Sequence, residues 1–228
     1  TRQRLLTSSD PDGRVTSFEY DDAGRGIVVA DPVGRRTRRV YDVAGQAVQI
    51  VGADNSAAQQ NTITVTYTAN GKMATIKDAR NNQTTYVYDG FDRVSRATMP
   101  DATYEELAYA ANGNMLSHLT RARQLITFSY DTLDRVTSKV VPQAGGAPAV
   151  QTSYVYDLAG RATQISDTNG HVIGYTFDTA KRVANATQSG PGIPSPRTVS
   201  YQYDAAGNRT RLTWPDAYYV QYAYDARH

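Results

Sequence analysis

Carboxylates at a regular spacing are the first feature of this sequence that suggests chemistry. An Asp directly follows an aromatic residue at nine places, and eight of these form the regular row, namely Asp21, Asp42, Asp89, Asp131, Asp157, Asp178, Asp204 and Asp225. A row of carboxylates suits calcium, which takes about six to eight oxygen ligands. The same side chains suit turn capping, because Asp accepts hydrogen bonds from backbone N–H groups two residues further on. Capping explains the whole row without a metal ion, and it is our prediction.

Few other side chains in the sequence suit catalysis. His118, His171 and His228 are the only histidines, they lie in different repeats of the pattern described below, and there is no Cys. Without Cys the chain has neither a thiolate nucleophile nor a disulfide. No Gly-rich phosphate loop leads from a strand into a helix. We interpret the histidines as surface or strand-packing residues, and we predict no enzyme activity, no cofactor and no metal site.

The densest basic run contains Arg35, Arg36, Arg38 and Arg39. On a strand, Arg35 and Arg39 share one face while Arg36 and Arg38 share the other, because successive side chains alternate. A solvated sheet edge is the simpler interpretation. The alternative is a contact with an acidic partner or an anionic glycan. The formal net charge of +2 argues against nucleic acid as the main partner.

The Asp residues belong to a six-residue motif, seen in Tyr156-Asp157-Leu158-Ala159-Gly160-Arg161, that recurs along the whole chain. Ten copies start at Tyr20, Tyr41, Tyr67, Tyr88, Tyr109, Tyr130, Tyr156, Phe177, Tyr203 and Tyr224, at intervals of 21 or 26 residues. A repeat this regular indicates an array of similar units. We therefore predict that residues 1–228 form a single repeat array of about ten repeats, a piece of a longer protein.

Each 21-residue interval has room for one β-hairpin and none for a helix. Turn signals such as Asp10-Pro11-Asp12-Gly13 alternate with the motif, which leaves two strands of about six residues. The fifth motif position needs a positive φ, as in a type I turn closed by a bulge, and Gly occupies it in six copies. Asp92 and Asp134 are tolerated there, whereas Lys181 and His228 fit less well.

The motif residues are thus predicted to be structural parts of a scaffold. Those that define it best are Tyr20, Asp21, Gly24, Tyr41, Asp42, Gly45, Tyr88, Asp89, Tyr130, Asp131, Tyr156, Asp157, Gly160, Arg161, Tyr203, Asp204 and Gly207. Two residues before each motif aromatic, nine of ten positions are apolar or aromatic, while the residues between are mixed. This alternation indicates strands with one packed face, on which we expect ladders of paired aromatic side chains.

The copies alternate between two types. Odd copies always carry Gly at the fifth position, whereas even copies vary there but always keep Asp at the second. Every 26-residue interval follows an even copy, and the extra residues fall in Gly52–Asn61, Pro142–Ala149 and Gln188–Arg197. Their composition predicts loops along one edge of the sheet.

The fold class that follows is all-β, with tandem antiparallel hairpins forming a long coiled sheet, a β-solenoid or spiral shell. About twenty strands at ~4.8 Å make a sheet roughly 95 Å long, which must coil or break up. The alternative is a β-propeller, since a four-strand unit of 42 or 47 residues matches one blade. The motif marks every hairpin rather than every second one, which favours the coiled sheet.

The motifs resemble YD repeats, also called RHS repeats, which occur in bacterial Rhs polymorphic toxins, in the C components of ABC toxin complexes and, more distantly, in teneurins. The stretches that carry the resemblance are Tyr88 to Val94, Tyr156 to Arg161 and Tyr203 to Arg209, and the resemblance extends over essentially the whole chain. It implies a hollow cocoon that encloses a toxic C-terminal domain, with the rest of the shell and that domain as partners. It also implies a secreted or exported bacterial protein, although Thr1 to Arg4 is not a signal peptide pattern.

In toxin members of the family an Asp-containing autoprotease follows the repeats, but this sequence ends inside a repeat, so no residue receives that role. No apolar run approaches the roughly 18 residues of a membrane span. The second functional hypothesis is a carbohydrate-binding or cell-surface-binding module. Its candidate ligand surface comprises Tyr154, Tyr201, Arg35, Arg36 and Arg38. For the tyrosines, packing within the sheet is the simpler interpretation.

Overall fold

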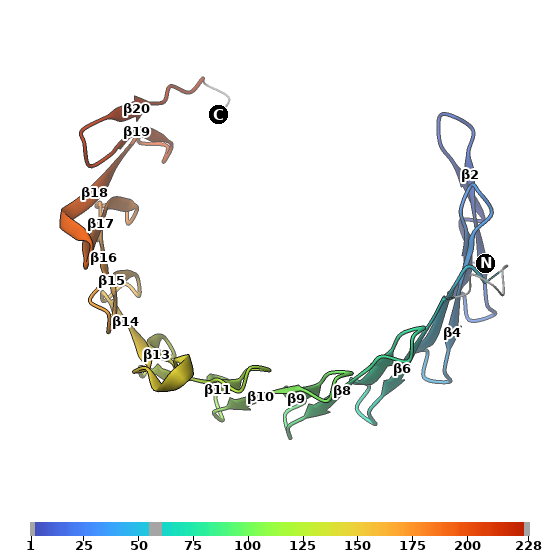
Figure 1. Cartoon of the computed structure of the whole chain (residues 1–228). Coiled ribbons are helices and arrows are strands. Elements are labelled where there is room, and N and C mark those ends of the chain that lie inside the picture. Colours follow the sequence, from blue (N-terminus) through green and yellow to red (C-terminus); the bar gives the residue numbers. More distant parts are fainter. Residues whose placement is uncertain (1–2, 55–60, 226–228) are drawn as a thin grey trace. The chain divides into compact units, whose positions relative to one another are not determined.

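The computed structural model describes residues 3–54 and 61–225, which fall into two compact units, unit 1 (Thr1–Glu106) and unit 2 (Leu107–His228). Within the described residues every regular element is a strand, except for the 3-10 turn Ala144–Gly146 (Figure 1). The predicted all-β architecture of tandem antiparallel hairpins is confirmed.

The described residues form twenty strands. They are β1 (Thr7–Ser9), β2 (Val15–Tyr20), β3 (Gly26–Ala30), β4 (Arg36–Tyr41), β5 (Ala47–Gly52), β6 (Asn61–Tyr67), β7 (Met73–Lys77), β8 (Gln83–Tyr88), β9 (Val94–Thr98), β10 (Tyr104–Tyr109), β11 (Met115–Leu119), β12 (Leu125–Tyr130), β13 (Val136–Val141), β14 (Val150–Tyr156), β15 (Ala162–Asp167), β16 (Val172–Phe177), β17 (Val183–Gly190), β18 (Ile193–Tyr203), β19 (Arg209–Thr213) and β20 (Tyr219–Gln221).

Within each unit, strands that follow one another in sequence pair with each other. In unit 1 an unbroken antiparallel ladder runs from β1 to the first half of β10, and in unit 2 another runs from β11 to β20. Propeller blades are separate sheets of about four strands. The ladders continue past every fourth strand, so the propeller alternative is wrong for both units.

The motif forms the same turn in every described copy. In the copy at Tyr156, the N–H of Asp157 donates to Arg161 O at 2.9 Å and the N–H of Gly160 donates to Asp157 O at 3.0 Å. The fifth position has positive φ in all nine described copies, at Gly24, Gly45, Gly71, Asp92, Gly113, Asp134, Gly160, Lys181 and Gly207. The prediction of a bulge-closed turn with positive φ is confirmed there, and His228 lies outside the described residues.

The opposite edge of each ladder repeats this turn more widely than the sequence predicts. Asp31 and Gly34 form it as expected, but so do the turns that begin at Met99, Thr120 and Trp214. These three lack Asp at the first position and Gly at the fourth, and they place Ala102, Arg123 and Ala217 at φ of 62°, 62° and 68°. Here the pairing of the two flanking strands imposes the conformation that the local residues do not favour.

The three 26-residue intervals differ in structure. The segment Pro142–Ala149 is irregular apart from its 3-10 turn, as predicted. The loop prediction for Gln188–Arg197 is wrong, because β17 and β18 extend through it and Gln188 pairs directly with Arg197. Only the tip at Pro191 and Gly192 turns. Residues 55–60 of the segment Gly52–Asn61 lie outside the described residues, and Gly52 pairs with Asn61.

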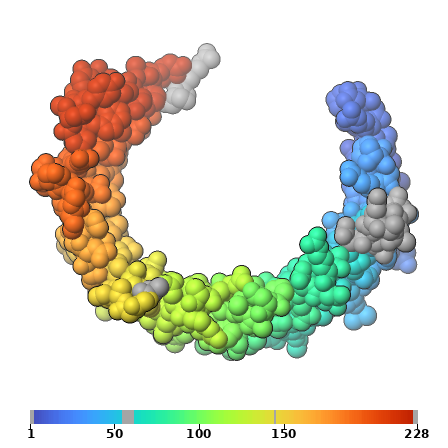
Figure 2. Space-filling view, viewed as in Figure 1, coloured from blue at the N-terminus to red at the C-terminus, as the bar shows by residue number. Residues whose placement is uncertain are grey.

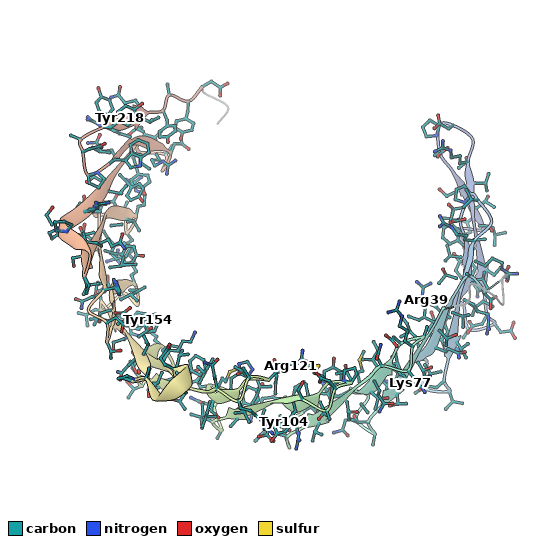
Figure 3. All side chains as sticks on the ribbon, in the orientation of Figure 1. Arg39, Lys77, Tyr104, Arg121, Tyr154 and Tyr218 are labelled. Carbon is teal, nitrogen blue, oxygen red and sulfur yellow. The ribbon has the colours of Figure 1, made fainter. Side chains whose placement is uncertain are left out.

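Each unit is a single layer of strands with two open faces (Figure 2). Only Val28, Val51, Val65 and Ala97 are buried apolar residues in the part of the chain described here. The accessible surface is 15190 Å², against about 10,000 Å² for a compact protein of this mass. Side chains accordingly project from both faces of the strands (Figure 3).

The two faces differ in chemistry. The face of the motif aromatics carries pairs such as Phe18 with Val29, Tyr86 with Ala97 and Tyr175 with Ala186. The predicted ladder of aromatic pairs is therefore wrong in one respect, because each aromatic strand lies between strands that supply mostly aliphatic partners. The other face is rich in hydroxyls, and its longest rows are Thr66, Thr75, Thr85, Thr98 in unit 1 and Ser129, Ser138, Ser153, Ser166 in unit 2.

Lys181 gives a direct test of the turn geometry. Its φ is 68°, a conformation that costs a residue with a Cβ roughly 1 kcal/mol or more. We expect Lys181→Gly to raise the free energy of unfolding by about 0.5–1 kcal/mol, because the relief of strain exceeds the loss of chain entropy. Urea unfolding followed by circular dichroism measures this. Lys181→Ala keeps the strain and serves as the control, so an equal gain in both variants contradicts the explanation.

Candidate functional site

The motif Asp residues cap their own turns. The Oδ1 atom of Asp157 accepts hydrogen bonds from the N–H groups of Ala159 and Arg161, both at 2.9 Å, and Oδ2 accepts one from Arg161 Nε at 2.7 Å. Equivalent bonds from the sixth-position Arg to both carboxylate oxygens occur at Asp21, Asp89, Asp131 and Asp178. The capping prediction is confirmed for these residues, and their oxygens are occupied by N–H donors.

These donors stabilise the ionised carboxylates. The backbone N–H of Arg161, followed by its guanidinium, holds the pKa of the Asp157 carboxyl below its ordinary value of 3.8. Hydrogen bonds from the sixth-position residue likewise lower the carboxyl pKa of Asp21, Asp89, Asp131, Asp178 and Asp204. The carboxylates are therefore suited to permanent charge in a turn and unsuited to proton transfer near neutral pH.

The Arg of the motif also reaches into the following repeat. The Arg135 guanidinium lies over the Tyr156 ring, 4.6 Å from its centroid, and Nη1 donates to Asp157 O at 3.2 Å. Arg182 makes the same two contacts with Tyr203 and Asp204. We call this arrangement the connector: a sixth-position Arg bound to its own Asp, stacked on the next motif aromatic and bonded to the next second-position carbonyl.

The motif tyrosines complete the link in the opposite direction. Tyr156 donates its hydroxyl hydrogen to Val136 O, the first residue of the strand that follows the preceding motif turn, at 2.8 Å. The same bond joins Tyr41 to Gly26, Tyr67 to Ala47, Tyr88 to Met73, Tyr130 to Met115, Tyr203 to Val183 and Tyr224 to Arg209, and Tyr20 donates in the same way to Leu5 O, ahead of β1. The motif is thus the contact between successive repeats.

Comparison with known proteins supports the same assignment. The model of the RHS repeat family matches residues 1–25 and 67–104. The structure of TcdB2-TccC3-TEV superposes with a TM-score of 0.73 at 13% identity, over 92% of this chain and 12% of that chain. The chain contains RHS repeats.

Two further structures share the fold. TcdB2-TccC3 without its hypervariable C-terminal region matches with a TM-score of 0.63 at 15% identity, over 95% of this chain and 16% of that chain. The Tc holotoxin pore of Photorhabdus luminescens, with a TccC3 mutation, matches with a TM-score of 0.57 at 15% identity and the same coverage. This RHS-repeat chain therefore spans about one sixth or less of these structures, and the likeness shows the fold alone. No curated protein sequence matches it.

The alternation of RHS copies has a structural reason in two of the copy pairs. Asn70, at the fourth position of an odd copy, donates to Oδ1 of Asp92, at the fifth position of the next even copy, at 2.9 Å. Asn112 and Asn114 bond to Asp134 in the same way, at 2.6 and 2.8 Å. The Asp side chain at the fifth position thus accepts a hydrogen bond from the neighbouring turn. Gly at this position has no side chain and accepts no such bond.

The residues predicted as a ligand surface are divided between the units. Tyr154 and Tyr201 are half-buried in unit 2, where they pair across strands with Ile165 and Leu212. In unit 1, Arg35, Arg36 and Arg38 form ion pairs with Asp31, Glu19 and Asp54 respectively. Within each unit these side chains have intramolecular partners, and the RHS-repeat packing accounts for their positions.

The histidines and acidic residues of the described segments form no group of three with the arrangement of a metal site. Asp167 caps the turn that contains His171, by accepting the His171 N–H at 2.9 Å, and His171 Nδ1 lies 3.1 Å from Asp167 Oδ2. His118 lies on β11, in unit 2. None of the described segments is a helix with the length and hydropathy of a membrane span.

Sequence reasoning missed the two contacts that make the site. It treats Arg161 as a structural part of the motif and assigns the Tyr rings to packing, and it predicts neither the stacking on the next repeat nor the hydroxyl bond. The signal was present, since Arg recurs at the sixth position and Tyr rather than Phe at the first. Packing alone does not require a hydroxyl, so the excess of Tyr indicates a hydrogen-bond partner.

Phe177 is the motif aromatic without a hydroxyl, and it tests the value of that bond. By the register of the other copies, a hydroxyl here faces Ala162 O. We expect Phe177→Tyr to stabilise the chain, and Tyr156→Phe to destabilise it, each by about 0.5–1.5 kcal/mol. Thermal unfolding of both variants provides the measurement. If Phe177→Tyr is destabilising while Tyr156→Phe is neutral, the hydroxyl contact between repeats contributes nothing.

The capped carboxylates predict a loss of stability in acid. Their folded pKa values lie below the ordinary 3.8, so their stabilisation is present above the unfolded pKa and disappears as pH falls through the folded one. We expect the unfolding midpoint to be constant above about pH 5 and to fall below about pH 4. Asp157→Asn retains one acceptor oxygen but does not ionise, so its decline should be shallower. A midpoint that is unchanged or raised in acid contradicts the explanation.

Proposed function

We propose that this chain is a structural segment of an RHS shell that encloses the toxic C-terminal domain of an exported bacterial toxin. The observation that carries the proposal is the connector. The Asp and Arg side chains that are most suited to chemistry hold neighbouring repeats together, as in the contacts of Arg135 and Arg182. Likeness of fold to TcdB2-TccC3 structures supports the same role.

Enclosing a domain requires a continuous wall of strands rather than a catalytic or binding site. Continuous antiparallel ladders leave no free strand edge between repeats, and a closed wall of this kind has no exposed edges to aggregate. The two faces suit different surroundings, because one carries aromatic and aliphatic side chains and the other rows of hydroxyls. We assign the aromatic face to the cargo side, since an apolar surface of this extent is unfavourable in water.

The test uses the complete polypeptide that contains this sequence. If the repeats form a wall around a C-terminal domain, trypsin should cleave that domain much more slowly in the complete protein than when it is expressed alone. Weakening the wall with Arg135→Gln and Arg182→Gln together should restore cleavage. Equal cleavage rates in the complete protein and in the isolated domain contradict enclosure.

Binding to a glycan or a cell surface stays a prediction. It rests on Tyr154, Tyr201, Arg35, Arg36 and Arg38, whose contacts within the sheet the packing already explains. Export from a bacterial cell and the pairing of this segment with further shell repeats belong to the same proposal as enclosure.

A further inference from the structure

Among the motif copies of unit 1 that have Asp at the second position, one lacks the sixth-position Arg. The copy at Tyr41 carries Gln46 at the sixth position, where Arg25, Arg93, Arg135, Arg161 and Arg182 stand in other copies. The rest of this connector is intact: Asp42 Oδ1 accepts the N–H of Gln46 at 2.8 Å, and the Tyr67 hydroxyl reaches Ala47 O at 2.9 Å. The turn therefore has the geometry of its neighbours but not their cation.

Gln46 does not replace the missing guanidinium. Its Nε2 donates to Gly71 O at 3.1 Å, in the next turn. Among the described atoms, Oδ2 of Asp42 accepts no hydrogen bond and pairs with no cation. In the other fully described motif turns with Asp at the second position, Oδ2 is bonded by an Arg or, at Asp204, by Asn208.

The place that the guanidinium takes elsewhere is open here. A groove of about 670 Å³ runs between this turn and the next, lined by Asp42, Gln46, Tyr67 and Thr68, with Val40 and Val65 among its apolar residues. In the equivalent interval after Tyr130, Arg135 stacks on Tyr156 and bonds to Asp131 Oδ2 and Asp157 O. The corresponding groups here are the Tyr67 ring, Asp42 Oδ2 and Thr68 O.

We propose that this groove binds an arginine side chain from a basic partner segment. The chain itself defines the ligand, since it fills the equivalent position with Arg in the matched copies at Arg135 and Arg182. A carboxylate oxygen, an aromatic face and a carbonyl oxygen together suit a planar guanidinium, which hydrogen-bonds in its plane and stacks through its faces. A Lys ammonium has no planar face to stack and is the weaker ligand. The inference does not depend on enclosure of a cargo.

A titration with N-acetyl-arginine amide, followed by NMR of the ¹⁵N-labelled chain, tests the proposal. We expect saturable shifts confined to the amides around Asp42, Gln46, Tyr67 and Thr68, with a dissociation constant in the range of about 1–50 mM for a single side chain. N-acetyl-citrulline amide has nearly the same shape without the charge, and it should bind about tenfold more weakly or not at all.

Three variants separate the site from general charge effects. Asp42→Asn keeps the oxygen that caps the turn but loses the charge, so binding should fall at least about tenfold. Gln46→Arg fills the groove from within, so it should abolish binding and raise the unfolding midpoint. Asp204→Asn removes a carboxylate whose Oδ2 is already bonded to Asn208, so it should leave binding unchanged.

Arg135→Gln adds a gain-of-function test, because it empties the equivalent position and should create a second binding site around Asp131 and Tyr156. The proposal is overturned by any of three results: no saturable shifts, equal binding of the citrulline derivative, or undiminished binding in both Asp42→Asn and Gln46→Arg.

Discussion

The structure depends on one composite interaction, in which an Arg is bound by the carboxylate of its own turn while it stacks on the aromatic ring of the next repeat. The Asp fixes the guanidinium in place through Nε and pre-orients it toward the next motif, as Asp131 does for Arg135. An isolated ion pair at the surface contributes little to the free energy of unfolding, because solvent and salt screen the attraction and ordering two long side chains costs entropy. Here the carboxylate also caps the backbone of its turn, and the ordered guanidinium also stacks on the next aromatic ring. The entropy lost when the two side chains are ordered is therefore offset by several contacts instead of one.

This dependence follows from the absence of a second layer. A domain normally stabilises its sheets by packing them against helices or other sheets. These repeats have no such partner within the described residues, and only four apolar residues are buried. The stability of each hairpin must therefore come from its neighbours along the ladder, through backbone hydrogen bonds, cross-strand pairs and the connectors. Such an array behaves as a chain of nearest-neighbour interfaces, in which each connector contributes at one boundary.

The features of this arrangement that depend on residues within a single repeat can be predicted from the sequence. Positive φ at Gly160 and capping by Asp157 are both local, and each has a residue type that signals it. The turn at Thr120 has no such signal, and its geometry comes from the strands on either side. The stacking of Arg135 on Tyr156 joins residues in different repeats, and only the register of the assembled ladder brings them together. At Gln188–Arg197 the structure has an extended hairpin in place of the predicted loop, because strand pairing outweighs the turn preference of the Gly and Pro residues there.

The same register explains why insertions are tolerated at one edge and not at the other. Tyr41 and Tyr88 reach the carbonyl 15 residues earlier, whereas Tyr67, Tyr156 and Tyr203 reach one 20 residues earlier. The five extra residues lie at the edge opposite the motif turns, where the chain leaves one strand and enters the next. They lengthen the path along the chain without moving the acceptor, which remains the first residue of the strand after the preceding motif turn. Five extra residues within a motif turn would instead displace the Asp, the Arg and the Tyr together. The edge of the motif turns is therefore fixed in length by the connectors, and the opposite edge is free to vary.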